Sequence, residues 1–253
     1  MTFIDINQAR IRYALIDGDA GRPHLVFLHE GLGCIEMWKD FPARLCAGTG
    51  CPGLLYDRRG HGQSSPLTGD RDIGYVHACA GELGLLLDRV LAGRPFILVG
   101  HSDGASIALI YGAAERPLLR AIVSEAAHVF VEARSVAGVR AAYGRYRQRG
   151  AEGLAKYHGD KTGTLFRAWA EVWTSGWFRS WNIEGLLPAV TCPVLAIQGA
   201  DDAYGTNRQV ESIVSRVTGP AQPLIVTDCG HAPHFERTDR VLAPLAHFIN
   251  TYG

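Results

Sequence analysis

Residues 97–106 read ILVGHSDGAS and place a short polar turn between two apolar segments. The segment before Gly100 is apolar and predicts a buried strand, whereas apolar residues at helical spacing follow Gly104. The turn fits the pattern G-x-S-x-G, in which a sharp strand-to-helix bend projects the hydroxyl of Ser102 above a sheet. Glycine suits both flanking positions because side chains there would clash in so tight a turn. The alternative is a glycine-rich turn that carries an incidental serine.

Short apolar runs and helical periodicities alternate along most of the chain. This alternation predicts an α/β fold with a mostly parallel central sheet and helices on both faces. Residues 127–188 lack the alternation, are rich in arginine and aromatic residues, and predict several short helices inserted between two core strands. We expect strands at 10–16, 24–28, 53–56, 96–99, 119–123, 194–198 and 224–227, and helices at 73–91, 103–115, 206–216 and 238–250.

Composition limits the classes of partner. The 253 residues include 25 acidic and 25 basic residues, and this balance argues against a nucleic-acid partner. No apolar run approaches the roughly 18 residues of a membrane span, and the start of the chain lacks the apolar segment of a signal peptide. We therefore expect a cytoplasmic protein without a membrane partner. The six cysteines are scattered without metal-ligand spacing, so free thiols and no metal site are expected.

A serine hydroxyl needs a base to become a nucleophile. The stretch TDCGHAPHFE follows a predicted strand and contains His231. An orienting carboxylate belongs between serine and histidine in chain order, and GADDAYG offers Asp201 and Asp202 after another strand. With Ser102, these residues would meet at the carboxyl ends of the strands, where open parallel sheets place their sites.

The motifs together resemble the α/β-hydrolase superfamily over essentially the whole chain. The resemblance implies a hydrolase core formed by 1–126 and 189–253, with a helical cap at 127–188. It also implies Asp202 as the acid and His231 as the general base, with Asp201 and His234 as their rivals. The motifs that carry it are HEGLG at 29–33, DRRGHGQS at 57–64, GHSDG at 100–104, GADD at 199–202 and GHAPHFE at 230–236.

The resemblance further implies an oxyanion hole formed by the backbone N–H groups of Gly31 and Asp103. Glu30 stands where the family usually has glycine, and a carboxylate there would repel an oxyanion unless it points away or is paired. We expect Glu30 to be buried and hydrogen-bonded, and the alternative is a direct role in substrate selection. The residues expected near the substrate are Glu30, Leu32, His101, Trp169 and Trp173.

Two patterns in the 127–188 segment have a packing interpretation and a functional one. Trp169, Trp173, Trp177 and Trp181 recur every four residues, but Ser175-Gly176 interrupts any single helix that would carry them all. We expect them to pack the cap on the core, with one or two walling an apolar pocket as the alternative. Five arginines form a solvated helix face or contact an acidic substrate: Arg134, Arg140, Arg145, Arg147 and Arg149.

The sequence therefore favours a serine hydrolase that cleaves a small carboxylic ester without a cofactor. A lactonase or enol-lactonase would use the same residues, as would a carbon–carbon bond hydrolase. The latter ranks lower because Ala232 stands where those relatives often have tryptophan. A prolyl aminopeptidase is disfavoured because HEGLG lacks the family's proline, and epoxide hydrolases and dehalogenases carry aspartate where Ser102 stands. The alternative from a different class is a non-catalytic ligand-binding protein on the same scaffold.

Overall fold

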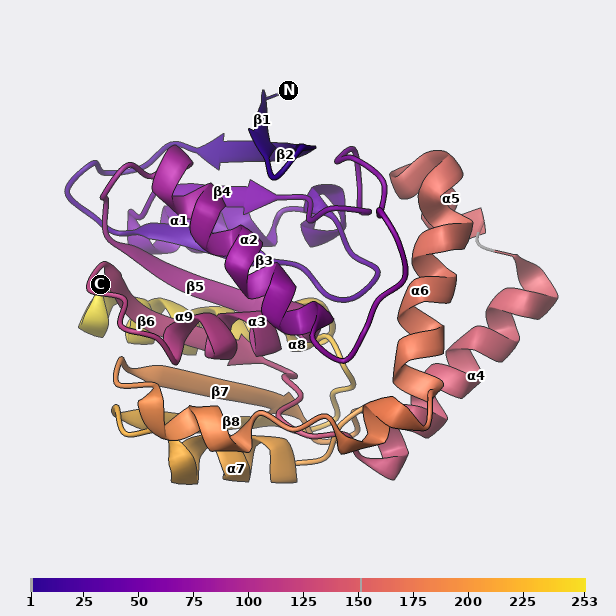
Figure 1. The fold of residues 1–253 in the computed structure, drawn as a ribbon. Helices are drawn as coiled ribbons and strands as arrows, with labels where there is room; N and C mark the ends of the chain where they lie inside the picture. Colours follow the sequence, from indigo (N-terminus) through magenta and orange to yellow (C-terminus); the bar gives the residue numbers. More distant parts are fainter. Residues whose placement is uncertain (1, 151) are drawn as a thin grey trace.

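A computed structural model describes residues 2–150 and 152–253. Its centre is an eight-stranded sheet with the strand order β1-β2-β4-β3-β5-β6-β7-β8 (Figure 1). β2 pairs antiparallel with β1 and β4, and every other neighbouring pair is parallel. This confirms the predicted α/β class. The strands are β1 Thr2–Ile6, β2 Ala9–Ile16, β3 His24–Leu28, β4 Gly53–Tyr56, β5 Phe96–His101, β6 Leu119–Glu125, β7 Val194–Gly199 and β8 Ala221–Val226.

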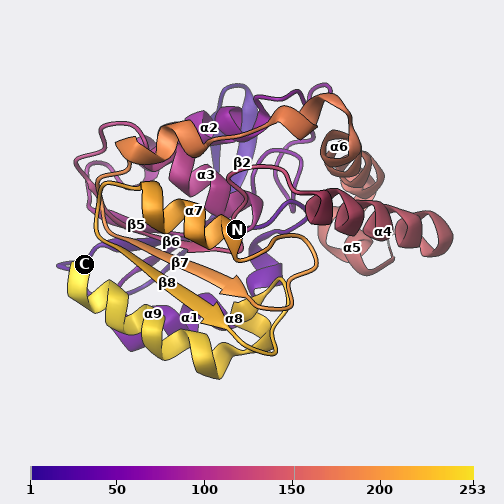
Figure 2. The same cartoon turned by 90° about the horizontal axis from the view of Figure 1, so that it is seen from below.

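Helices cover both faces of the sheet. Figure 2 shows α2, α3 and α7 on one face and α1 and α9 on the other. Successive strand residues alternate between two buried clusters: in β5, Leu98 packs on the α2 and α3 side, and Ile97 and Val99 on the α1 and α9 side. These helices are α1 Phe41–Thr49, α2 Tyr75–Val90, α3 Asp103–Gly112, α7 Arg208–Arg216, α8 Pro233–Glu236 and α9 Thr238–Tyr252. Over the described ranges, no helix is long and apolar enough to cross a membrane.

The segment between β6 and β7 is helical and lies beyond the carboxyl ends of the parallel strands (Figure 1). α6 carries Trp169 and Trp173 and ends before Ser175, as the interruption in the sequence predicted. The boundaries of a separate cap at 127–188 stay a prediction. The helices are α4 Ala133–Arg149, α5 Glu152–His158 and α6 Thr162–Thr174, with 3-10 turns at η2 Gly159–Lys161, η3 Trp177–Ser180 and η4 Glu184–Ala189; η1 Ile35–Trp38 follows β3.

Most differences from the expected elements lie at edges and ends, but the nine-residue helix α1 was not predicted either. β1 was not predicted, because five residues of mixed polarity at a sheet edge give a weak signal. β8 begins at Ala221 rather than 224, since an edge strand tolerates the exposed Gln222 and Pro223. α3 ends at Gly112 rather than 115, where glycine has a low helix propensity.

All six cysteines are free, as predicted. Cys46 and Cys229 are among the four that are buried. Burial raises the pKa of Cys46 to about 12 and that of Cys229 to about 11, so both thiols stay protonated near neutral pH. They therefore act as small apolar side chains in the core.

Candidate active site

Ser102 stands on the turn between β5 and α3 with a backbone φ of 54°, a conformation that costs an L-residue energy. A β-carbon on Gly104 would lie 2.0 Å from the carbonyl oxygen of Leu28. One on Gly100 would lie 2.5 Å from the carbonyl oxygen of Gly104. Both positions therefore require glycine, which confirms the physical reason predicted for the G-x-S-x-G pattern.

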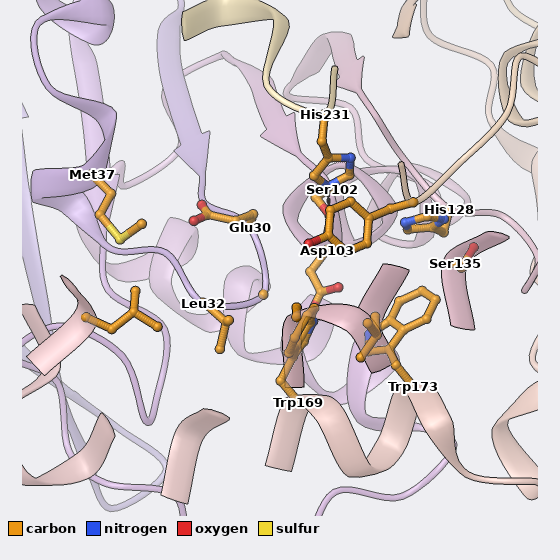
Figure 3. Close-up of a pocket in the computed structure, with 15 residues that line it drawn as sticks. Glu30, Leu32, Met37, Ser102, Asp103, His128, Ser135, Trp169, Trp173 and His231 are labelled. Atoms are coloured by element: carbon orange, nitrogen blue, oxygen red, sulfur yellow. Dashed lines mark hydrogen bonds between the residues drawn. The ribbon is translucent and has the colours of Figure 1, made fainter. Parts of the chain in front are cut away.

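A chain of hydrogen bonds links Ser102 to a buried carboxylate. His231 Nε2 lies 2.9 Å from Ser102 Oγ (Figure 3), and His231 Nδ1 lies 2.7 Å from Asp202 Oδ2. Asp202 is fully buried and also accepts hydrogen bonds from Gln198 Nε2 and the Tyr204 N–H. Burial alone would raise the pKa of Asp202, but the hydrogen bond and charge of His231, together with the Tyr204 N–H, outweigh it and lower the pKa to about 2. The ionised Asp202 holds a proton on Nδ1 and leaves Nε2 free to accept the serine proton.

The two rival residues lie outside this chain of hydrogen bonds. Asp201 is exposed, and its N–H donates to the carbonyl of Cys229. His234 is buried, and its Nδ1 lies 2.8 Å from Glu125 Oε1.

The residues that carry the two proposed oxyanion donors are neighbours in space. A β-carbon on Gly31 would lie 3.1 Å from Asp103 Oδ2 and 2.6 Å from the ring of Trp169. Within residues 2–150 and 152–253, neither the Gly31 N–H nor the Asp103 N–H has a hydrogen-bond partner. Asp103 is also the first residue of α3, where the helix dipole favours a negative charge. Both groups are thus available to an anionic oxygen.

The loop that carries Gly31 is fixed from behind by its neighbours. The carbonyl of Gly31 accepts a hydrogen bond from His61 Nε2, and His29 Nε2 accepts one from the Arg58 N–H. The DRRGHGQS turn is tied in as well, because Asp57 accepts hydrogen bonds from the N–H groups of residues 35 and 63. Asp57 thus ties this turn to the loop that follows β3.

A pocket of about 230 Å³ opens in front of Ser102 (Figure 3). Four of the five residues expected near the substrate line it: Glu30, Leu32, Trp169 and Trp173. The remainder of the wall is mainly apolar, from Met37 after β3 and from Val139, Ala142 and Leu154 in the helical insertion.

His101 lies outside the pocket lining, although it was expected there. Its ring lies beneath the loop that carries His231, and its Nε2–H donates to the His231 carbonyl at 2.8 Å. Sequence reasoning missed His128 and Tyr204, which both line the pocket. His128 follows the end of β6 by three residues, so its place at the carboxyl edge of the sheet was the available signal.

Glu30 takes a position other than the expected buried, hydrogen-bonded one. Its side chain is 25% exposed and faces the pocket, and its Oε2 lies 3.9 Å from His101 Nδ1, beyond hydrogen-bond reach. Gly33 permits this placement, because a β-carbon there would lie 2.0 Å from Glu30 Oε2. Burial raises the pKa of Glu30.

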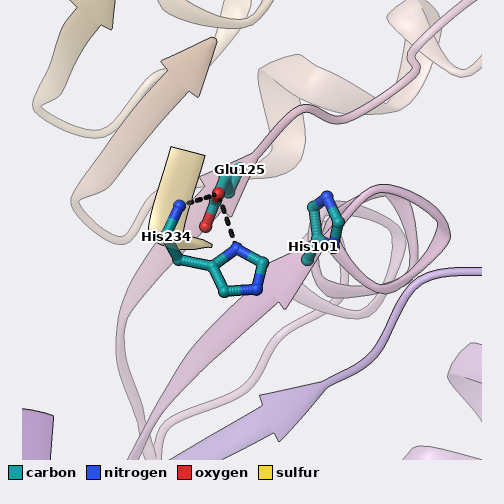
Figure 4. Close-up of side chains that lie close together, drawn as sticks. All are labelled: His101, Glu125 and His234. Atoms are coloured by element: carbon teal, nitrogen blue, oxygen red, sulfur yellow. Dashed lines mark hydrogen bonds and ion pairs between the residues drawn. The ribbon is translucent and has the colours of Figure 1, made fainter. Parts of the chain in front are cut away.

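A second buried cluster supports the His231 loop from below (Figure 4). Glu125, at the end of β6, accepts hydrogen bonds at Oε1 from both the N–H and Nδ1 of His234, each at 2.8 Å. Burial opposes ionisation of Glu125, but the neighbouring His234 lowers its pKa overall. The ring of His101 completes the cluster, with its centroid 4.8 Å from that of His234.

The helical insertion is fastened to the core near Gly31. His158, at the end of α5, accepts a hydrogen bond at Nδ1 from the Gly62 N–H and donates from Nε2 to the Leu32 carbonyl, both at 2.8 Å. Lys161 Nζ donates to backbone carbonyls of the same turn, including that of Gly62. Two polar side chains therefore hold the insertion against the loop that lines the site.

A mostly parallel sheet, a serine on a strained strand-to-helix turn, and a histidine and an aspartate after later strands define an α/β-hydrolase architecture. Residues 25–243 match the alpha/beta hydrolase family, and the chain belongs to it.

Similar proteins support hydrolase activity at the level of the family. Over 115 residues the chain is 35% identical to sn-1-specific diacylglycerol lipase ABHD11 of Mus musculus. That match covers 45% of this chain and 35% of the relative, so it spans about a third of the relative's length.

Two solved structures show the same fold. The enol-lactonase from Burkholderia xenovorans LB400 has a TM-score of 0.76 at 21% identity, covering 98% of this chain and 99% of its own. A thermophilic esterase from Thermogutta terrifontis has a TM-score of 0.73 at 19% identity, covering 96% and 94%.

Proposed function

We propose that this protein is a serine hydrolase that cleaves a small carboxylic ester through an acyl-enzyme on Ser102. The observation that carries the proposal is the hydrogen-bonded chain from Ser102 through His231 to Asp202. Its geometry matches what nucleophilic acyl transfer requires: a nucleophile, a base within reach and a buried group that orients the base.

In the first half-reaction, Ser102 Oγ attacks the ester carbonyl while His231 Nε2 takes its proton. Asp202 stabilises the imidazolium that forms. The N–H groups of Gly31 and Asp103 stabilise the tetrahedral oxyanion, and removing either donor would cost about 3 kcal/mol. Collapse of the intermediate breaks the ester C–O bond, and the leaving alcohol takes the proton from His231.

In the second half-reaction, water attacks the acyl-enzyme and loses its proton to His231. The oxyanion forms again at the same donors, and its collapse releases the acid and returns the proton to Ser102. We propose that the 127–188 segment acts as a cap that supplies the apolar wall for the substrate. A pocket of about 230 Å³ suits a short acyl or alcohol group.

The proposal is tested by turnover of p-nitrophenyl esters from acetate to decanoate by wild type and Ser102→Ala. We expect wild type to favour short chains, and the variant to lose at least about a thousandfold in kcat. Ser180→Ala, which removes an exposed hydroxyl on η3, is the matched control and should retain activity. Failure of folded wild type to hydrolyse any ester would overturn the proposal, and turnover of lactones alone would replace it with a lactonase.

A further inference from the structure

The pocket in front of Ser102 is lined by acidic side chains. Two carboxyl groups, Glu30 and Asp103, are among the described residues that line it, and no lysine or arginine is. Asp103 Oδ2 accepts a hydrogen bond from the Tyr75 hydroxyl at 3.1 Å. The carboxyl of Glu30 lies 3.9 Å from His101 Nδ1, and the nearby Arg58 guanidinium donates to the backbone carbonyl of Glu30 rather than to its carboxyl. The pocket therefore offers an acceptor that no side chain of the described ranges uses.

The neighbouring histidines do not compensate for these charges. Burial, with His234 nearby, lowers the pKa of His101 to about 3, and burial with His231 nearby lowers that of His128 to about 4. Both imidazoles are neutral near pH 7. His128 is only 3% exposed, packs its ring against Trp173 and lines the pocket. Its Nδ1 lacks a hydrogen-bond partner in the part of the chain that the structure describes.

The reaction itself would add a further negative charge to this site. A tetrahedral oxyanion at the N–H groups of Gly31 and Asp103 would form beside the Glu30 carboxylate. Like charges that share one pocket repel each other, and the repulsion grows where water is excluded. A positive charge on the substrate would remove this repulsion, and the indole rings of Trp169 and Trp173 form a wall that suits a cation.

We infer that the substrate of the proposed esterase carries a protonated amine close to its ester bond, held by the Glu30 carboxylate. The inference rests on the proposed function. Glu30 is thus a specificity-determining residue, because its carboxylate favours substrates that carry the protonated amine.

Two pairs of esters of matched shape test the inference. The first pair is 2-(dimethylamino)ethyl acetate and 3-methylbutyl acetate, which differ by N–H⁺ in place of C–H on the alcohol side. Ethyl N,N-dimethylglycinate and ethyl isovalerate make the same exchange on the acyl side. In a pH-stat near pH 6.5, we expect kcat/KM of the amine to exceed that of its neutral partner at least about tenfold in one pair.

Glu30→Gln should abolish this preference, by lowering kcat/KM for the amine roughly tenfold and raising it for the neutral ester. Glu171→Gln removes the same charge from the exposed face of α6 and is the matched control, for which the preference should persist. Equal rates within both pairs, or a preference that survives Glu30→Gln, would overturn the inference.

Calorimetric titration of the Ser102→Ala protein with the same esters gives a readout that does not depend on turnover. The amine should bind more tightly than its neutral partner, and the difference should disappear when Glu30→Gln is added. Equal affinities would overturn the inference even if no ester is turned over. Hydrolysis of neutral esters that depends on Ser102 but shows no amine preference would leave the proposed function standing without it.

Discussion

Two histidine–carboxylate pairs lie one above the other at the carboxyl edge of the sheet, and their surroundings differ. His231 Nδ1 lies 2.7 Å from Asp202, and His234 Nδ1 lies 2.8 Å from Glu125. The side chain of His231 is 20% exposed and reaches Ser102 in the pocket (Figure 3). That of His234 is 2% exposed and lies outside the lining of the pocket.

Under the proposed mechanism, access to the pocket, rather than the pair itself, separates the reactive histidine from the structural one. The ring of His234 packs against Trp38 and Phe41, with centroids 4.9 and 5.2 Å away. No substrate can exchange a proton with a ring enclosed in this way. The pair of His234 and Glu125 instead fixes the backbone three residues beyond His231. It thereby positions the pair of His231 and Asp202.

Replacing His231 should have the largest effect on kcat. His231→Ala removes the base from Ser102, and we expect kcat to fall by about a millionfold while the free energy of unfolding changes little. His77→Ala, an exposed position on α2, is the matched control. Ester turnover and urea unfolding measure the two quantities, and a variant that keeps more than a few percent of kcat would contradict the assignment.

Asp202→Asn should have the next largest effect. The amide cannot hold the proton on His231 Nδ1, so we expect kcat to fall by roughly ten-thousandfold. The neighbouring Asp201→Asn changes an exposed carboxylate and should leave kcat nearly unchanged. The same ester assay measures both variants, and comparable losses in the two would show that the orienting acid is misassigned.

Substitutions in the pair of His234 and Glu125 should change the free energy of unfolding more than they change kcat. Glu125→Gln leaves His234 without its charged partner, and we expect a loss of about 3–5 kcal/mol in the free energy of unfolding. Replacing both residues with leucine should restore part of this loss, because no buried charge then remains unpaired. Urea unfolding measures the free energies. A Glu125→Gln protein with wild-type stability would mean that the pair does not fasten the loop.

The smallest expected effect is a dependence of stability on pH. His101 has a pKa of about 3 in the fold and about 6.5 when unfolded, so the unfolded chain binds an extra proton between these values. The free energy of unfolding therefore falls as the pH drops below about 6.5, by up to about 1.4 kcal/mol per pH unit for this histidine.

His101→Gln keeps a donor for the His231 carbonyl but removes the titration, so it should flatten this dependence. Urea unfolding between pH 7 and 4.5 measures it, with His77→Gln as the exposed control. An unchanged pH dependence in His101→Gln would exclude this histidine as its source.

Much of the sheet could be predicted, because apolar runs bounded by turn residues mark buried strands. β3 and β4 have the predicted bounds. The sequence also indicated that Ser102, Asp202 and His231 would meet, since parallel strands bring their carboxyl ends to one edge. The structure places the three side chains within hydrogen-bond reach, and their catalytic roles stay proposals.

The rest of the site depends on contacts that no local pattern encodes. The pairing of Glu125 with His234 joins positions 109 residues apart. The direction of the Glu30 side chain is decided by the space above Gly33, which is visible only in three dimensions. His128 carries no motif, and its place in the pocket follows from how β6 ends.

The two hydrogen bonds that His158 makes limit how the helical insertion of this protein can be redesigned. Its ring joins Leu32, next to Gly31, to the turn at Gly62. If an insertion from another protein replaces this one, it must supply an imidazole at the same place. Otherwise the loop that carries Gly31 loses the hydrogen bond that its neighbour Leu32 accepts from His158. Substitutions at Val139 and Ala142 on α4 reshape the pocket without touching these bonds. Redesign of the insertion should therefore keep His158, whereas Val139 and Ala142 can be varied.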